Sequence, residues 1–127
     1  MTSSASTALP LRDGTRLVWE SAGEGPVVLL VHGIGSSRRK WEPQVAPLVA
    51  LGYRVLRFDL RGFGDSTTPA APHEMRHFSG DLAALVEALD LGRFHLVGHS
   101  LGGMIAQQFA LDHPGRVRTL ALASTTS

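Results

Sequence analysis

The feature that most constrains the fold is a strand-turn-helix pattern around residue 100. A short apolar run at 94–97 stops at Gly98, and apolar residues at helical spacing follow Ser100. Ser100 lies between two glycines, Gly98 and Gly102, each two positions away. A serine held in a strained turn needs neighbours without bulk, because strand and helix pass close to each other there. The pattern therefore predicts a sharp turn that lifts Ser100 above the end of a sheet.

This arrangement is the nucleophile-elbow pattern, in which a serine side chain is exposed between a strand and a helix. The helix that follows directs its first free N–H groups at the space above Ser100, where negative charge develops during acyl transfer. The alternative is that Ser100 is only a small residue in a tight turn. The strand before it and the helix after it favour the role of nucleophile.

Strand and helix patterns alternate along the chain. Asp13-Gly14 between two short alternating segments predicts a hairpin, and the continuous apolar run Val27–Val31 predicts a strand buried on both faces of a parallel sheet. We therefore expect an α/β fold with a mostly parallel sheet and an N-terminal antiparallel hairpin. The expected strands lie at 8–12, 15–20, 27–31, 53–58, 94–97 and 117–123, and the expected helices carry Trp41 to Val49, Met75 to Leu89 and Leu101 to Asp112.

Length and composition limit the classes of protein. The 127 residues suit one domain at 8–127, preceded by a small, polar and disordered tail at 1–7. The net charge of +1 with scattered Lys and Arg gives no nucleic-acid footprint. The absence of cysteine excludes disulfides, thiolate metal sites and a cysteine nucleophile, and fits a reducing cytoplasm. The start lacks the features of a secretory signal, and no apolar run is long enough for a membrane span. We expect a cytoplasmic protein without a metal, cofactor, nucleic-acid or membrane partner.

Three motifs together resemble the serine-dependent α/β-hydrolase superfamily. The string also resembles its branch of small bacterial esterases, enol-lactonases and cofactor-free haloperoxidase-like proteins. The resemblance runs from about Leu9 to the last residue, and implies the strand order 1-2-4-3-5-6 with 27–31 and 94–97 adjacent at the centre. The motifs are His32-Gly33-Ile34-Gly35, Asp59-x-Arg61-Gly62-x-Gly64-x-Ser66 and Gly98-His99-Ser100-Leu101-Gly102-Gly103.

The resemblance implies roles for particular residues. Ser100 matches the nucleophile, and the backbone N–H groups of Leu101 and Ile34 match the oxyanion donors. Gly33 and Gly35 let the Ile34 amide turn inward, where a Cβ atom would block the approach. Serine at position 100 separates the chain from the dehalogenases and epoxide hydrolases, whose nucleophile is aspartate, and favours a small-molecule ester, lactone or similar acyl substrate. The other residues that support the motifs are His32, Gly98, His99 and Gly102.

Some candidate residues have a structural interpretation beside the functional one. Ile34, Trp41 and Met104 are candidates to line an acyl pocket, although aromatic and sulfur side chains pack more often in a core. For Asp59 and Arg61 we expect a turn shaped by carboxylate-to-backbone bonds and an ion pair, rather than a catalytic role.

The chain departs from the superfamily in its missing base. The superfamily has its acid and histidine after the nucleophile, beyond the sixth strand, and none of the six histidines here matches that position. We therefore expect an N-terminal half that lacks the triad acid and histidine. It would need a C-terminal half, or would self-associate through the strand at 117–123, whose open edge is a template for pairing. His73 or His77 as the base is the least favoured source.

The sequence thus predicts a hydrolase that acts through an acyl intermediate on Ser100. One alternative is a non-catalytic module that keeps the turn and the oxyanion loop as a receptor for a ligand. Another is a vestigial half-domain that self-associates.

Overall fold

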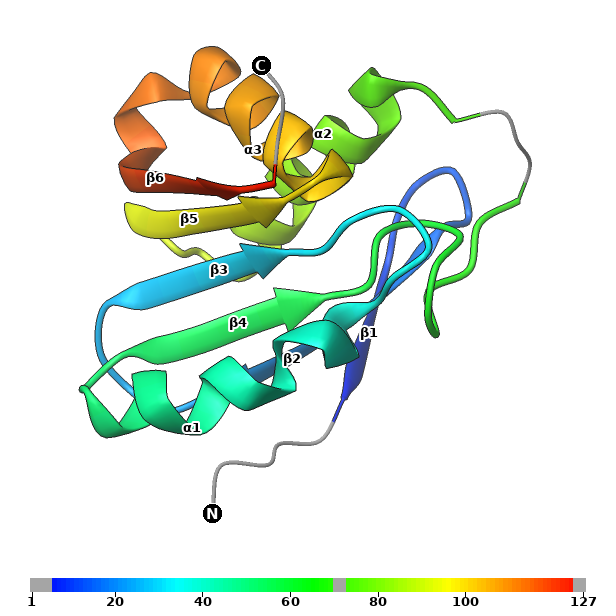
Figure 1. Cartoon of the computed structure of the whole chain (residues 1–127). Helices are drawn as coiled ribbons and strands as arrows, with labels where there is room; N and C mark the ends of the chain where they lie inside the picture. The colour runs from blue at the N-terminus through cyan, green and yellow to red at the C-terminus, as the bar shows by residue number, and fades with distance from the viewer. Residues whose placement is uncertain (1–5, 70–72, 125–127) are drawn as a thin grey trace.

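The computed structural model of the chain describes residues 6–69 and 73–124. Its centre is one six-stranded sheet with three α-helices (Figure 1). The strands are β1 (Thr7–Pro10), β2 (Arg16–Ala22), β3 (Val27–Val31), β4 (Arg54–Phe58), β5 (Phe94–His99) and β6 (Val117–Ala123). The helices are α1 (Glu42–Ala50), α2 (Met75–Ala88) and α3 (Leu101–Asp112), with 3-10 turns η1 (Arg38–Trp41) and η2 (Pro114–Arg116).

The order of strands across the sheet is β1-β2-β4-β3-β5-β6. β1 and β2 pair antiparallel, as do β2 and β4, whereas β4, β3, β5 and β6 run parallel. Each parallel connection crosses over through a helical segment, as parallel neighbours require. The predicted fold class, strand order and central pair of strands are confirmed.

The predicted hairpin joins β1 to β2 through a loop at 11–15. The Leu11 N–H donates to the Thr15 carbonyl oxygen over 2.8 Å, and Gly14 in the loop has a φ of 92°. Thr7 already pairs with Trp19 between β1 and β2, so the tail predicted at 1–7 extends one residue too far. The rest of that prediction falls on residues 1–5, outside the described part, and on Ser6, which precedes the strand.

The sheet separates two apolar clusters. Figure 1 shows α1 on one face and α2 with α3 on the other. Apolar side chains of α2 and α3 form the larger cluster against the sheet, and Trp41 and Val45 belong to the smaller one on the α1 side. All five residues of β3 are buried because both faces of this strand are covered, as its continuous apolar sequence predicts.

β6 forms one outer edge of the described sheet. Beyond its first residue this strand is exposed, including Leu120 and Leu122, which are 38% and 43% exposed. The carboxyl ends of β3 and β5 lie next to each other farther inside the sheet, where the predicted site falls. In the part of the chain that the structure describes, no helix has the length and apolar character that a membrane crossing requires.

Candidate active site

Ser100 occupies a sharp turn between β5 and α3. Its backbone has φ 57° and ψ −122°, a conformation that residues other than glycine rarely adopt. The N–H groups of Gly103 and Met104 donate to its carbonyl oxygen over 2.9 and 3.2 Å, and its own N–H donates to Ala123 over 3.1 Å. Because α3 starts and β6 attaches at this residue, the surroundings hold the strained conformation in place. The predicted strand-to-helix turn is confirmed.

The two glycines that flank Ser100 are required by space. A Cβ atom on Gly98 would lie 2.4 Å from the carbonyl oxygen of Gly102. A Cβ atom on Gly102 would lie 2.2 Å from the carbonyl oxygen of Val31, at the end of β3. Both contacts are with backbone, which cannot move aside, so the close approach of β3, β5 and α3 depends on these glycines.

The loop after β3 comes directly against Ser100. A Cβ atom on Gly33 would lie 2.9 Å from the Cβ atom of Ser100, so a side chain there would push the loop away. Gly35 differs, because no atom of the described residues lies within 4 Å of a Cβ at that position and its φ is +70°. A Cβ atom at position 33 would therefore block the approach of the loop to Ser100, as predicted. Gly35 instead supplies a backbone conformation with positive φ, which other residues rarely adopt.

His32 is fully buried beneath this loop. Its Nε2 atom accepts a hydrogen bond from the N–H of Leu60 over 2.9 Å, so the ring proton is assigned to Nδ1. Nδ1 then donates to the carbonyl oxygen of Gly33 over 2.7 Å, and Ser36 donates to the same oxygen over 3.3 Å. Burial lowers the pKa of His32, which keeps the ring neutral. The imidazole thus connects the loop after β3 to the loop after β4.

A hollow of about 370 Å³ opens beside Ser100. Ile34 and Met104 contribute apolar side chains to it and are 71% and 43% exposed. The structure thus places both beside Ser100, together with Leu101, the first residue of α3. Among the described residues, the lining of this hollow contains no histidine and no carboxylate. The lining residues are Ile34, Ser100, Leu101, Met104 and Ser124.

Trp41 does not join this hollow. The side chain is 7% exposed and packs between the α1 segment and the sheet, in a cluster with Val28, Leu30, Val45 and Val55. The prediction that Trp41 lines the substrate pocket is therefore wrong, and its core alternative is right, because the start of α1 covers the sheet face at this point.

His99 directly precedes Ser100 in the sequence. Its Nδ1 atom is buried near Gly33 and has no hydrogen-bond partner within the described residues.

A buried ion pair connects the segment after β3 to the segment after β4. The fully buried Asp59 carboxylate accepts from the backbone N–H of Arg38 over 2.7 Å and of Asp65 over 2.9 Å, and pairs with the Arg38 guanidinium. Arg38 also contacts Glu20 over 3.1 Å. The turn-shaping role expected for Asp59 agrees with these contacts. Arg38 was not predicted, because its neighbours Arg39 and Lys40 make the stretch resemble an exposed basic turn.

Comparison with known proteins assigns the family. The sequence profile described as "alpha/beta hydrolase fold" matches residues 26–127. The chain belongs to the alpha/beta hydrolase family. Among the curated relatives of this alpha/beta hydrolase, Epoxide hydrolase 3 of Siraitia grosvenorii is 39% identical over 110 residues, which cover 85% of this chain and 35% of the relative. Fluoroacetate dehalogenase of a Burkholderia species is 42% identical over 105 residues, covering 79% and 34%.

A solved structure gives the same result for the fold of this alpha/beta hydrolase. An esterase from Exiguobacterium antarcticum superimposes with a TM-score of 0.90 at 32% identity, covering 95% of this chain and 46% of the esterase chain. The chain spans about a third of the length of the curated relatives named above. These relatives therefore do not assign a reaction to this chain.

Proposed function

We propose that this alpha/beta hydrolase carries the nucleophile and the oxyanion donors for hydrolysis of an ester, a lactone or a similar acyl substrate. The observation that carries the proposal is the position of Ser100. Its strained turn raises it at the carboxyl end of β5, in a hollow shared with Ile34 and Leu101. In the reaction, the Ser100 oxygen bonds to the carbonyl carbon as the alcohol leaves, and water then releases the acid from the acyl-serine.

Two backbone N–H groups are suited to stabilise the oxyanion. Leu101 is the first residue of α3, and the first N–H groups of a helix have no partner within the helix. The Ile34 N–H belongs to the same peptide unit as the Gly33 carbonyl, which His32 holds. Because N–H and C=O point in opposite directions across a trans peptide, the N–H is directed away from His32. Both groups thus suit the developing negative charge.

The serine side chain favours acyl carbon over alkyl carbon. Two relatives are named as an epoxide hydrolase and a fluoroacetate dehalogenase, and both names imply attack on an alkyl carbon. Such an attack by Ser100 would leave an ether on the protein, which water does not cleave at neutral pH. Attack on an acyl carbon leaves an ester, which water hydrolyses. This difference favours the esterase among the relatives as the guide to substrate class.

Ser100 needs a general base to act as a strong nucleophile. The described lining of the hollow supplies neither a histidine nor a carboxylate. We propose that both come from outside this chain, either from a C-terminal half of the hydrolase or from a second copy that pairs with β6.

The test is covalent labelling of the 127-residue chain with a fluorophosphonate ester, followed by intact-mass spectrometry and peptide mapping. We expect one phosphonate adduct, located on Ser100 and lost in Ser100→Ala, that forms slowly because the oxyanion donors act here without the base of a complete hydrolase. The same samples are given 4-nitrophenyl acetate and styrene oxide, and we expect slow but measurable turnover of the ester alone, since the base is missing. Circular dichroism of both proteins checks that they are folded.

A folded chain with no adduct and no ester turnover contradicts the proposal for this chain. It favours the alternative of a module that binds a ligand without turnover. Turnover of styrene oxide that is lost in Ser100→Ala contradicts the acyl substrate class.

A further inference from the structure

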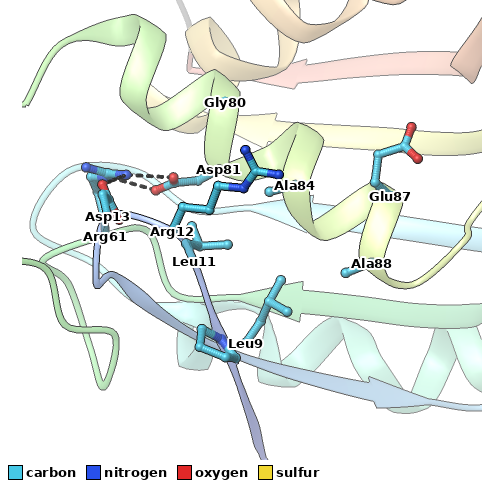
Figure 2. Close-up of a pocket in the computed structure, with 11 residues that line it drawn as sticks. Leu9, Leu11, Arg12, Asp13, Arg61, Gly80, Asp81, Ala84, Glu87 and Ala88 are labelled. Carbon is cyan, nitrogen blue, oxygen red and sulfur yellow. Dashed lines mark hydrogen bonds and ion pairs between the residues drawn. The ribbon is translucent and has the colours of Figure 1, made fainter.

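A second hollow lies away from Ser100, between the β1 hairpin and α2 (Figure 2). Its volume is about 670 Å³, compared with about 370 Å³ beside Ser100, and the two hollows share no lining residue. This size falls within the range of about 300–1,000 Å³ that is usual for small-molecule sites. The proposed hydrolysis leaves it unused.

The walls of this hollow are largely apolar. Leu9 and Leu11 form the hairpin side, and Ala84 and Ala88 belong to α2. Gly80 lies one turn before Ala84, and a Cβ there would meet no atom within 4 Å in the part of the chain that the structure describes. Small residues on this stripe of α2 therefore leave space that larger side chains would fill.

The carboxylates in the wall are already paired with cations. Both oxygens of Asp81 accept hydrogen bonds from Arg61 at 2.7 Å, and Asp13 accepts from Arg61 at 3.0 Å. Figure 2 draws the contacts between Arg61 and Asp81 as dashed lines. Glu87 pairs with Arg116 over 3.1 Å. These acids therefore have little remaining capacity to attract a cationic ligand.

Arg12 differs from the other charged residues of this wall. Its side chain is exposed and, within residues 6–69 and 73–124, forms no ion pair or side-chain hydrogen bond. Figure 2 shows it extending from the hairpin loop toward α2, above the apolar side chains. Among the described lining residues, the charged side chain without a partner is therefore a cation, Arg12.

We infer that this hollow binds an amphipathic carboxylate, a small molecule with one carboxylate and an apolar body. The Arg12 guanidinium pairs with the carboxylate, for which its planar geometry allows two parallel hydrogen bonds. The apolar body lies between Leu9 and Leu11 on one side and Ala84 and Ala88 on the other, where its burial is favourable. The inference does not depend on the chemistry at Ser100.

The first experiment is isothermal titration of the 127-residue chain with octanoate below its micelle concentration. We expect saturable binding at one site per chain. Arg12→Gln removes the charge and should weaken binding about fivefold, the usual limit for an exposed ion pair. Arg93→Gln is the matched control, because Arg93 is exposed and lies outside the lining of the hollow. It should bind like the unmodified chain.

A second variant tests the apolar wall. Ala84→Leu fills the hollow from a partly exposed stripe of α2, and should abolish octanoate binding while the thermal transition stays within a few degrees of the unmodified chain. Acetate and 1-octanol, which each lack half of the ligand, should both bind more weakly than octanoate. Octanoate binding that is absent, non-saturable, or unchanged in either Arg12→Gln or Ala84→Leu would overturn the inference.

Discussion

The Nδ1 atom of His32 lies 2.7 Å from the carbonyl oxygen of Gly33, and this bond fixes the direction of the next N–H group. The carbonyl of Gly33 and the N–H of Ile34 share one planar peptide unit. A hydrogen bond that holds the oxygen against the buried imidazole therefore directs the N–H to the opposite side. The same ring accepts from Leu60, so the loop after β4 and the proposed oxyanion donor are linked through one side chain.

His32→Ala should loosen this loop and destabilise the chain. In this variant the buried Leu60 N–H loses its acceptor, and the Gly33 carbonyl oxygen loses the donor that His32 supplied. We expect these losses to lower the free energy of unfolding by roughly 2–4 kcal/mol. Urea denaturation measures this change, and fluorophosphonate labelling of Ser100 should slow as well. His113→Ala is the control, because His113 is exposed at the end of α3, and should cost less than about 1 kcal/mol.

The contribution of His32 should also depend on pH. Burial lowers its pKa in the folded state below the ordinary value of 6.5, so the unfolded chain takes up this proton first as the pH falls. The stability that His32 contributes is therefore fully present above about pH 6.5 and is lost as the pH decreases below it. The difference in unfolding free energy between the unmodified chain and His32→Ala should shrink from about pH 7.5 to about pH 5. A constant difference contradicts the neutral, buried imidazole.

Gly102→Ala should disrupt the turn at Ser100. The added Cβ would lie 2.2 Å from the Val31 carbonyl oxygen and 2.4 Å from that of His32, so α3 would have to move off β3. We expect a loss of about 3 kcal/mol or more in urea denaturation, with loss of Ser100 labelling. Gly80→Ala makes the same change at a position with no described atom within 4 Å of the new Cβ, and should stabilise α2 by roughly 0.5–1 kcal/mol. Equal stability of the two variants would contradict the steric account.

Asp81→Asn should show how much the buried ion pair with Arg61 contributes. Asp81 is 4% exposed and binds Arg61 through both oxygens. Its neutral replacement leaves Asp13 as the carboxylate partner of the guanidinium among the described residues. We expect a loss of about 3 kcal/mol in thermal or urea denaturation. Glu74→Gln removes one partner of an exposed pair with Arg76, and should change stability by less than about 0.5 kcal/mol. Similar effects of both substitutions would contradict the prediction that the buried Arg61–Asp81 pair contributes more to stability than an exposed pair.

Asp13 should contribute to stability only above strongly acidic pH. Hydrogen bonds from the backbone and side chain of Thr15, with a smaller effect of Arg61, lower the pKa of Asp13 from 3.8 to about 2. The unfolded chain is therefore protonated first on acidification, and the stability from Asp13 is present above about pH 4 and lost as the pH falls toward 2. The advantage of the unmodified chain over Asp13→Asn, measured by urea denaturation, should disappear across this window. An advantage that persists at about pH 2 is the contrary outcome.

The 127-residue chain should self-associate through β6. The outer side of this strand carries backbone groups that pair with no other strand of the described sheet, and Leu120 is 38% exposed. Light scattering should give a mass above that of one chain, and Leu120→Lys should lower it. Leu51→Lys places the same charge on an exposed leucine at the end of α1 and should leave the mass unchanged. A monodisperse monomer of the unmodified chain contradicts this prediction.

Much of the fold and the turn at Ser100 could be predicted from the sequence, because local pattern controls them. The continuous apolar run of β3 indicates a strand covered on both faces, and its neighbours follow the usual crossovers of parallel strands. The spacing of Gly98 and Gly102 around Ser100 reflects contacts between adjacent elements, with backbone atoms at 2.2 to 2.4 Å from an added Cβ. Such steric requirements act over a few residues and so remain visible in the sequence.

The surroundings of the site were decided only by tertiary structure. Arg38 and Asp59 are 21 positions apart, and their pairing depends on how the loops after β3 and β4 meet. Trp41 packs in the core rather than beside Ser100, and the hollow with Arg12 exists because small residues of α2 face the hairpin. A charged or aromatic side chain has the same local pattern whether it is buried, paired or exposed. Its partner is chosen by the packing of segments distant in sequence, and spacing along the chain does not specify that choice.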